Sequence, residues 1–519
     1  MVTTYKTDFS VSWEDPADAQ LPWVYDPMHV PAPVAPLGQE FWDRMYIRYM
    51  SARTVFVNGY GFSTPPTPAP PPPEIVERGV LDVWNKDYLP EITGTCERLR
   101  KRDYDSMSLE QLGDALEGIM EDAIHGFGFT MKPISGFMGP TFGFVEFLQN
   151  EIGPEGPQVV ATLLQGFENG TASAGAGLSD LAEEAAKRPA VADCLRLGQF
   201  DDLESVDGGA EFMAQFRSYL DNYGWRIDSW GTIERPTWAE NPRMPLTLIA
   251  HYVSDPKRSP AAAHQRAVQQ REEAAQNIES RISADKLPQF RGLLAATQSH
   301  VPVSEGRALW QLLIMGSFRV PVLALGRKLV DAGALGSPDQ VFYFNTKELK
   351  EAAHNPALAV RATAENRQED FAAWRELTPP PFLGSEPDPT QMPPEMAPLL
   401  HLFFGLGRPN VEGREIRGQA ASKGVVRGKA RVIRDLGEAE RLQPGEVLVC
   451  QTTAPPWTPL FAIASAVVTD SGGVLSHSAI CAREYAIPCV VATQVATKMI
   501  EDGSMITVDG TKGTVLLQS

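Results

Sequence analysis

The sequence contains few of the residues that mark a zinc-binding or nucleic-acid-binding protein. Five cysteines occur among 519 residues. None belongs to a CxxC pair, so the spacing predicts no zinc or other metal site. Acidic residues outnumber basic ones by 65 to 46, which gives a net charge of −19. This balance argues against binding to nucleic acid or to an anionic membrane, because both need basic patches.

Long apolar runs are also missing. The N-terminus lacks the apolar core of a secretory signal. The most apolar stretch, Leu309 to Leu325, contains Arg319 and Pro321 and is therefore no uninterrupted membrane span. The sequence predicts a cytoplasmic protein without membrane attachment. Its length predicts two or three domains.

A nucleotide-binding signature is equally absent. The sequence has no Walker A motif, and the glycines from Gly170 to Gly177 do not lie between a predicted strand and a predicted helix. Function must therefore be sought in other patterns along the chain.

The first part of the chain, residues 1–73, is predicted to be irregular and to end in a proline-rich strap. Within it, Thr54–Val57 has the pattern of a strand, and the Asn58-Gly59 pair that follows indicates a turn. The second part, residues 74–377, is predicted to be a large, mainly α-helical domain. Ser108 begins one clear helical pattern there, as a cap ahead of apolar residues at helical spacing.

Two further helices are expected in this domain. The highly charged stretch Ala261 to Ile282 is predicted to form a solvated arm, and the apolar stretch Arg307 to Ala332 a central helix. Residues 378–411 are rich in proline and are predicted to be a mobile interdomain linker. The alternative is a proline-rich loop packed on the surface. In residues 412–519 short strands alternate with one or two helices, which predicts a compact β/β/α module.

The most informative run extends from Thr469 to Pro488 and contains His477. Val467-Val468 is typical of the end of a buried strand, and Gly472-Gly473 of a tight loop. Ser476 is a good helix N-cap, which places His477 where a helix begins. The positive end of the helix dipole disfavours imidazolium and leaves a ring nitrogen free to attack. A capped structural histidine is the alternative to a phosphohistidine here.

This run resembles the phosphohistidine motif of the swivelling domain in phosphoenolpyruvate synthase, pyruvate phosphate dikinase and their relatives, the PEP-utilising enzyme mobile domain. The similar segments are residues 421–428, 444–449, 453–459, 469–488 and 508–513. The resemblance implies that His477 carries a phosphoryl group as a covalent intermediate. Gly472 and Gly473 would let backbone N–H groups approach the phosphoryl oxygens.

Three side chains are expected to support His477. Thr469 and Ser476 are candidates to hydrogen-bond the ring or the phosphate. Arg483 follows in the same helix, about two turns on, and is expected to share a face with His477. The alternative for Arg483 is a structural salt bridge.

The middle of the chain resembles the acceptor-binding helical region of rifampin phosphotransferase and of phenylphosphate-synthase-like proteins. The segments that carry this second resemblance are residues 84–91, 164–166, 221–226, 236–242, 326–333 and 339–344. Full-length relatives add an ATP-grasp domain, for which we find no counterpart in this sequence. The chain thus looks like one subunit of a split, hetero-oligomeric enzyme similar to phenylphosphate synthase or 4-methylbenzyl phosphate synthase, which would suit the catabolism of aromatic compounds.

The resemblance implies an ATP-dependent phosphotransferase. ATP and Mg²⁺ would bind on a separate ATP-grasp subunit, and AMP and phosphate would be released. Phosphorylated His477 would then transfer its phosphoryl group to the hydroxyl of a phenolic or small aromatic alcohol. Candidate acceptor residues are His125, Arg226, Glu305 and Arg319. Arg319 lies in an apolar helix and must have a partner there. Glu305 is followed by Gly306-Arg307 where relatives often carry an acidic residue and a histidine. A phosphocarrier without a small-molecule acceptor, and a ligase that activates a carboxylate, are the alternative functions.

Overall fold

In the computed structural model the chain divides into two compact units. One unit comprises Met1–Gly136, Arg226–Thr237 and Trp310–Pro389, and the other comprises Phe137–Trp225, Trp238–Leu309 and Thr390–Ser519. The structure describes residues 8–13, 15–27, 29–67, 69–168, 170–227, 229–256, 259–357, 360–387, 405, 409–434 and 436–518. These units are assembled from separate segments and do not follow the four contiguous parts expected from the sequence, which remain predictions.

The first unit contains a four-stranded antiparallel sheet in the order β2-β3-β1-β4. Its strands are β1 (Pro22–Tyr25), β2 (Thr54–Val57), β3 (Tyr60–Ser63) and β4 (Phe382–Gly384). Strand β2 and the turn after it were predicted, and Asn58 and Gly59 have the positive φ values, 50° and 73°, of a tight hairpin turn. The prediction that residues 1–73 are irregular is wrong, because apolar side chains such as Trp23 and Phe62 form a core with this sheet.

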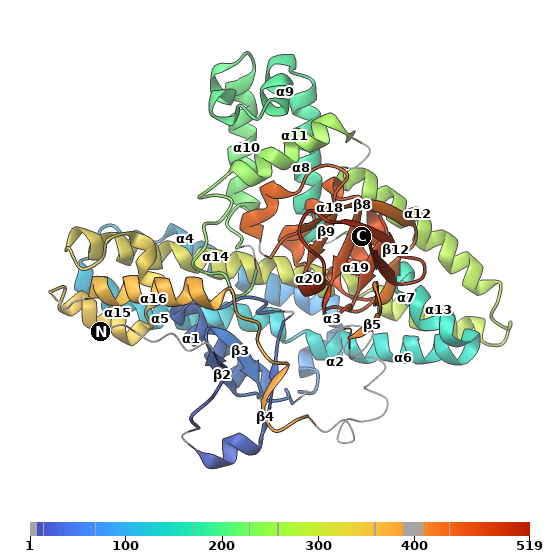
Figure 1. Ribbon diagram of the computed structural model, residues 1–519, viewed down its shortest axis with the longest axis horizontal. Coiled ribbons are helices and arrows are strands. Elements are labelled where there is room, and N and C mark those ends of the chain that lie inside the picture. The colour runs from blue at the N-terminus through green and yellow to red at the C-terminus, as the bar shows by residue number, and fades with distance from the viewer. Residues whose placement is uncertain are drawn as a thin grey trace. The chain divides into compact units, whose positions relative to one another are not determined.

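Strand β4 also corrects the predicted linker. Phe382–Gly384 pairs with β1, far away in sequence, so this end of residues 378–411 is part of a sheet (Figure 1). Residues 388–404 and 406–408, on which most of the linker prediction rests, lie outside the described residues.

Helices form the rest of the first unit. The longer ones are α1 (Pro36–Met45), α4 (Leu89–Lys101), α5 (Leu109–Met131), α15 (Thr346–His354), α16 (Val360–Trp374) and the part of α14 (Val301–Asp331) that begins at Trp310. The predicted cap at Ser108 is confirmed, since its side chain and that of Gln111 form a reciprocal capping box. By length and composition alone, the helical stretch Leu287–Asp331 could cross a membrane, but 78% of its most apolar window is buried, as expected of a core helix.

The second unit includes α6 (Ile134–Ile152) from Phe137 on, α7 (Gly156–Leu163), α8 (Gly170–Ala186), α9 (Pro189–Arg196), α10 (Gly209–Tyr223), α11 (Arg243–Ser254), α12 (Pro260–Glu279), α13 (Leu287–Gln298) and the start of α14. The prediction that α12 is a solvated arm is wrong. It packs on α7 and α8, and Ala263, Ala267 and Ile278 are buried there. Its charged residues misled the prediction, because small alanines make the contact.

A nine-stranded mixed sheet carries His477. Its strands are β5 (Asn410–Glu412), β6 (Glu415–Arg417), β7 (Gln419–Ser422), β8 (Val425–Val432), β9 (Val447–Cys450), β10 (Ala466–Thr469), β11 (Cys489–Val491), β12 (Met505–Asp509) and β13 (Thr514–Leu517). The order is β5-β6-β13-β12-β8-β9-β10-β11-β7, and β8, β9, β10 and β11 run parallel. Short helices α18 (Leu460–Ile463), α19 (His477–Glu484) and α20 (Ala496–Met499) connect these strands. The predicted fold class, a large helical region with a C-terminal β/β/α module, is confirmed.

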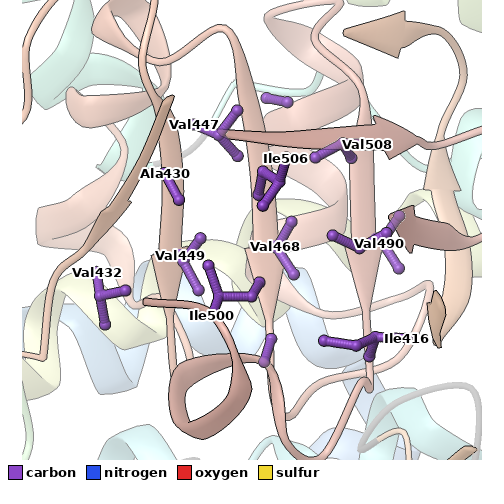
Figure 2. Packing of buried hydrophobic residues seen from close by; sticks show 13 residues of the cluster. Ile416, Ala430, Val432, Val447, Val449, Val468, Val490, Ile500, Ile506 and Val508 are labelled. Carbon is purple, nitrogen blue, oxygen red and sulfur yellow. The ribbon is translucent and has the colours of Figure 1, made fainter. Parts of the chain in front are cut away.

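The core of this module holds together the strands whose following loops form the site. Val449, Val468, Val490 and Ile506 are fully buried between the strands (Figure 2). Strands β9 and β10 lie side by side and parallel, so the loops that follow them leave the same edge of the sheet. In parallel sheets this edge commonly carries the functional loops.

Candidate functional site

His477 is the first residue of α19, directly after the loop that leaves β10. Ser476 caps the helix, with its hydroxyl accepting a hydrogen bond from the N–H of Ala479, as predicted. Gly472 has a φ of 89°, and a Cβ there would lie 2.8 Å from Oγ of Ser476. A glycine is therefore required at Gly472 for both its backbone conformation and its close approach to the cap.

The imidazole of His477 contacts two side chains that were not among its predicted partners. Oγ1 of Thr458 lies 3.1 Å from its Nε2, and Sγ of Cys481 lies 3.4 Å from the same nitrogen. Thr458 follows β9, so the parallel pairing of β9 and β10 brings the two loops together. Cys481 is four residues after His477 in α19, which places it one helical turn away on the same face.

The ring is held in its neutral form. The side chain is partly buried, and burial lowers the pKa of His477 to about 4. At neutral pH the imidazole therefore has a lone pair on one ring nitrogen. This is the state that a nucleophile requires.

The two hydroxyls that were predicted to support His477, those of Thr469 and Ser476, have structural partners instead. Thr469 donates to the carbonyl of Ser471 at 2.8 Å, which fixes the start of the loop. Ser476 is occupied by the helix cap. Asp470 is also buried and accepts hydrogen bonds from Thr493 and Thr497. These residues shape the loop, and the ring nitrogens of His477 instead contact Thr458 and Cys481.

Arg483 does not share a face with His477, contrary to the prediction. It lies six residues on, roughly 600° around the helix, whereas Glu484 at seven residues on returns to the same face. The guanidinium donates through Nη1 to the carbonyls of Ala421 and Val474, at 2.9 and 3.0 Å. Burial lowers its pKa to about 10. Arg483 thus clamps the loop before His477 onto β7.

A group of charged side chains, including Glu305 and Glu484, lies at α19. Burial raises the pKa of Glu305, and the positive charges of Arg307 and Arg483 partly offset this effect. Burial and the neighbouring Glu305 raise the pKa of Glu484 to about 7, although a hydrogen bond from the backbone of Gly166 acts in the other direction. Among the four predicted acceptor residues, Glu305 is the one that the structure brings into the electrostatic neighbourhood of α19.

The guanidinium of Arg307 belongs to the same group. Burial lowers its pKa to about 10, and it lies over the ring of Phe137 at 5.8 Å. Its buried Nε has no hydrogen-bond partner among the described residues, and the same holds for Nε and Nη2 of Arg483. Two arginines with unused donors therefore accompany the buried carboxylate of Glu305.

The remaining predicted acceptor residues, His125, Arg226 and Arg319, belong to the unit that does not contain His477. His125 is exposed on helix α5, with its ring edge-on to Phe129 at 5.1 Å. Arg226 is buried. Arg319 is buried as well, and it donates to the carbonyl of Ile233 and lies over the ring of Phe342 at 4.7 Å. The expectation that Arg319 has a partner in its apolar helix is confirmed.

No group of three or more His, Cys, Asp or Glu side chains that could hold a metal ion occurs among the described residues. A cavity of about 10 Å³ in the first unit, lined by Asp26, Trp42, Tyr46 and Phe56 among others, has room for a single water and not for a substrate.

Comparison with known families defines the class of the site. Residues 442–513 match the family model of the PEP-utilising enzyme, mobile domain. Residues 131–305 match the model of the rifampicin phosphotransferase fourth domain. The chain is therefore similar to proteins that carry these two domains, and the predicted resemblances to the mobile domain and to rifampin phosphotransferase are confirmed.

Several curated proteins are similar to this chain. The rifampicin phosphotransferase of Streptomyces sviceus is 31% identical over 68% of the chain and 40% of its own length. The uncharacterized phosphotransferase YvkC of Bacillus subtilis is 31% identical over 62% of the chain and 38% of its own length. The chondramide synthase cmdD of Chondromyces crocatus is 30% identical over 98% of the chain but 14% of its own length. The chain thus spans less than half of each of these relatives.

Proposed function

We propose that this chain carries a phosphoryl group on His477 from ATP to the hydroxyl of a small organic acceptor, expected to be a phenol or an aromatic alcohol. The observation that carries the proposal is the neutral imidazole at the start of α19, at the carboxyl edge of a sheet that matches the PEP-utilising mobile domain. An ATP-grasp domain, expected on a separate subunit, would bind ATP and Mg²⁺.

In the first step a ring nitrogen of His477 attacks the β-phosphorus of ATP. An N–P bond forms, the P–O bond to AMP breaks, and the ring releases one proton. Water then attacks the γ-phosphorus, the P–O bond between the γ- and β-phosphoryl groups breaks, and inorganic phosphate leaves, so that one phosphoryl group stays on the ring. Thr458 orients the imidazole through its contact with Nε2. Gly472 and Gly473 allow backbone N–H groups to face the phosphoryl oxygens. Over the whole cycle ATP, water and the alcohol give AMP, inorganic phosphate and the phosphate ester.

In the second step the acceptor oxygen attacks the same phosphorus. An O–P bond forms, the N–P bond breaks, and the hydroxyl proton passes to a carboxylate, for which Glu305 is the candidate base. Phosphoryl transfer depends mainly on positioning and on neutralisation of the phosphoryl oxygens. Arg307 has an unused buried donor and a positive charge beside Glu305, which suits it to neutralise these oxygens.

The match of residues 131–305 to a rifampicin phosphotransferase domain supports a small-molecule acceptor over a pure phosphocarrier. The name of one relative states that it acts on rifampicin, a much larger molecule than the proposed acceptors. The acceptors tested must therefore include both small aromatic alcohols and rifampicin.

The decisive experiment incubates the chain with ATP, Mg²⁺ and a candidate ATP-grasp protein and records its intact mass. We expect one acid-labile phosphate on the wild-type chain and none on His477→Ala, with His300→Ala as the matched control. Phosphate that remains on His477→Ala would refute the carrier residue. Phenol, 4-methylbenzyl alcohol and rifampicin are then offered to the phosphorylated chain. Formation of a phosphate ester supports the proposal. Transfer of the phosphoryl group only to another protein supports a phosphocarrier, and a condensed carboxylate product supports a ligase.

A further inference from the structure

Two apolar side chains just before His477 are buried outside the core of their own module. Val474 and Leu475 are 7% and 8% exposed. The core of the nine-stranded sheet, which includes Val468 and Val490, does not contain either of them. A module that presents two apolar residues from the loop of its reactive histidine requires another surface to cover them.

The surface that covers them belongs to the helical segment of the same unit. Val474 and Leu475 join an apolar cluster whose other members come from α6, α7, α12 and α13 and from the turn after α12. These members are Phe144, Val145, Phe147, Leu148, Val160, Ala161, Leu163, Ile278, Ile282 and Phe290. The cluster falls within the segment that matches the rifampicin phosphotransferase fourth domain.

The loop that carries the two side chains is fixed from within its own module. The N–H of Val474 donates to Oε1 of Gln419 at 3.2 Å, and its carbonyl accepts from Arg483 at 3.0 Å. The N–H of Ser476 donates to the carbonyl of Gly473 at 2.9 Å. Val474 and Leu475 are therefore presented as a preformed pair, which costs little conformational entropy when they dock.

A polar contact flanks the apolar one. Helix α19 lies against α12, and the carboxylate of Glu484 faces the backbone N–H of Gly166. Arg271 of α12 holds that loop by donating to the carbonyls of Gln165 and Gly166, at 3.0 and 2.5 Å. Gly166 has a φ of 69°, and a Cβ there would lie 2.7 Å from the backbone nitrogen of Val268. The loop that faces Glu484 is thus fixed to α12.

We propose that Val474 and Leu475 form a docking plug that seats the His477 loop in the cluster of α6, α7, α12 and α13, with Glu484 as its polar flank. The plug positions His477 against the acceptor segment and is released when the histidine is charged elsewhere. This functional meaning rests on the proposed phosphotransfer, but the docking itself does not.

The first test measures docking without any phosphate. Amide hydrogen exchange is followed by mass spectrometry on the full chain and on Leu475→Ser. We expect peptides of α6 and α7 to exchange about tenfold faster in the variant, the factor that corresponds to 1.4 kcal/mol. Peptides of β9, β10 and β11 should not change, because the plug is no part of their core.

The second test measures access to the histidine. Potassium phosphoramidate phosphorylates imidazole directly, as an N–P bond to His477 forms, the P–N bond of the reagent breaks and ammonia leaves. We expect Leu475→Ser to be phosphorylated at His477 several-fold faster than the wild type. Leu475→Met conserves volume and should behave as the wild type. Leu516→Ser, on an exposed position of β13, is the matched control.

The proposed docking is wrong if, in Leu475→Ser, amide exchange in α6 and α7 and the reactivity of His477 are both unchanged while the strands remain protected. If Leu475→Ser exposes the strands, Val474→Ala gives the same test with a smaller change. If exchange rises as expected but His477 never accepts phosphate from ATP and a partner, the docking surface stands and the proposed function fails.

Discussion

Oγ1 of Thr458 lies 3.1 Å from Nε2 of His477, although the two residues are 19 positions apart and follow different strands. The contact exists because β9 and β10 are parallel neighbours and their following loops meet at one edge of the sheet. An imidazole that must accept and release a phosphoryl group needs a fixed orientation, and the hydroxyl of Thr458 supplies one polar contact for it.

Replacement of Thr458 by valine should slow the phosphorylation of His477. A hydrogen bond of this kind contributes about 1 kcal/mol, which corresponds to roughly a fivefold change in rate. The rate of phosphate incorporation from phosphoramidate, followed by intact mass, measures the effect. Thr458→Ser keeps the hydroxyl and should restore most of the rate, whereas equal rates for serine and valine would show that the hydroxyl does not matter.

Replacement of Glu305 by glutamine should separate the two half-reactions. Phosphorylation of His477 is expected to be unchanged, while transfer to an acceptor slows by roughly 10²- to 10⁴-fold because the base is lost. The measurement charges the chain first, removes the donor and then follows loss of phosphate after addition of an alcohol. Glu155→Gln is the matched control, since that carboxylate is exposed and pairs with Arg281. A variant that transfers as fast as the wild type contradicts the role of Glu305.

Gly472→Ala should destabilise the C-terminal module more than Gly445→Ala. Both glycines have a positive φ, 89° and 87°, so each substitution carries a conformational cost of about 1 kcal/mol. At Gly472 the new Cβ also meets Oγ of Ser476 at 2.8 Å, whereas at Gly445 it meets nothing within 4 Å. Thermal unfolding and amide exchange in α19 measure the difference. If Gly472→Ala and Gly445→Ala lower the stability of the module equally, the side chain of Ser476 can move aside.

Acid should destabilise the first unit through Asp26. Burial alone would raise the pKa of this carboxyl, but His29 and Tyr46 lower it to about 2. The folded-state pKa lies below that of the unfolded chain, so the stabilisation is complete above about pH 4 and is lost as the pH falls toward 2. Its size is about 2 kcal/mol.

Urea unfolding of the wild type and of Asp26→Asn, recorded between pH 6 and pH 2.5, checks this prediction. The free energy of unfolding should be larger for the wild type than for Asp26→Asn at pH 6, and this difference should shrink as the pH falls. A difference between the two proteins that stays constant over this range would contradict it.

The sequence predicted the local elements around His477 well, and the reason is physical. The cap at Ser476, the glycine pair and the apolar strand β10 depend on neighbouring residues, whose preferences can be read in order. Strand β2 and its Asn58-Gly59 turn were predicted for the same reason. The family comparisons then confirmed what the motifs indicated.

The errors came from contacts between distant residues. Strand β4 pairs with β1 across more than 300 positions, so nothing in its proline-rich neighbourhood indicated a strand. Helix α12 packs on α7 and α8 through buried alanines, and because alanines give no strong apolar pattern beside many charges, the sequence predicts a solvated arm there. The contact of Thr458 with the ring was not predicted, although residues 453–459 carried part of the resemblance, because the contact depends on the parallel pairing of β9 and β10. Cys481 lies one helical turn after His477, so helical spacing alone could have indicated its contact with the ring.

By itself, the sequence determined that His477 begins a short helix behind a glycine loop and that the chain resembles phosphohistidine enzymes. These are properties of consecutive residues, which local backbone preference and side-chain capping fix. Only the tertiary structure decided what surrounds the ring and where the loop docks. Thr458, the charges at Glu305 and the apolar cover of Leu475 come from segments far apart in the chain. Packing of the whole unit brings them together.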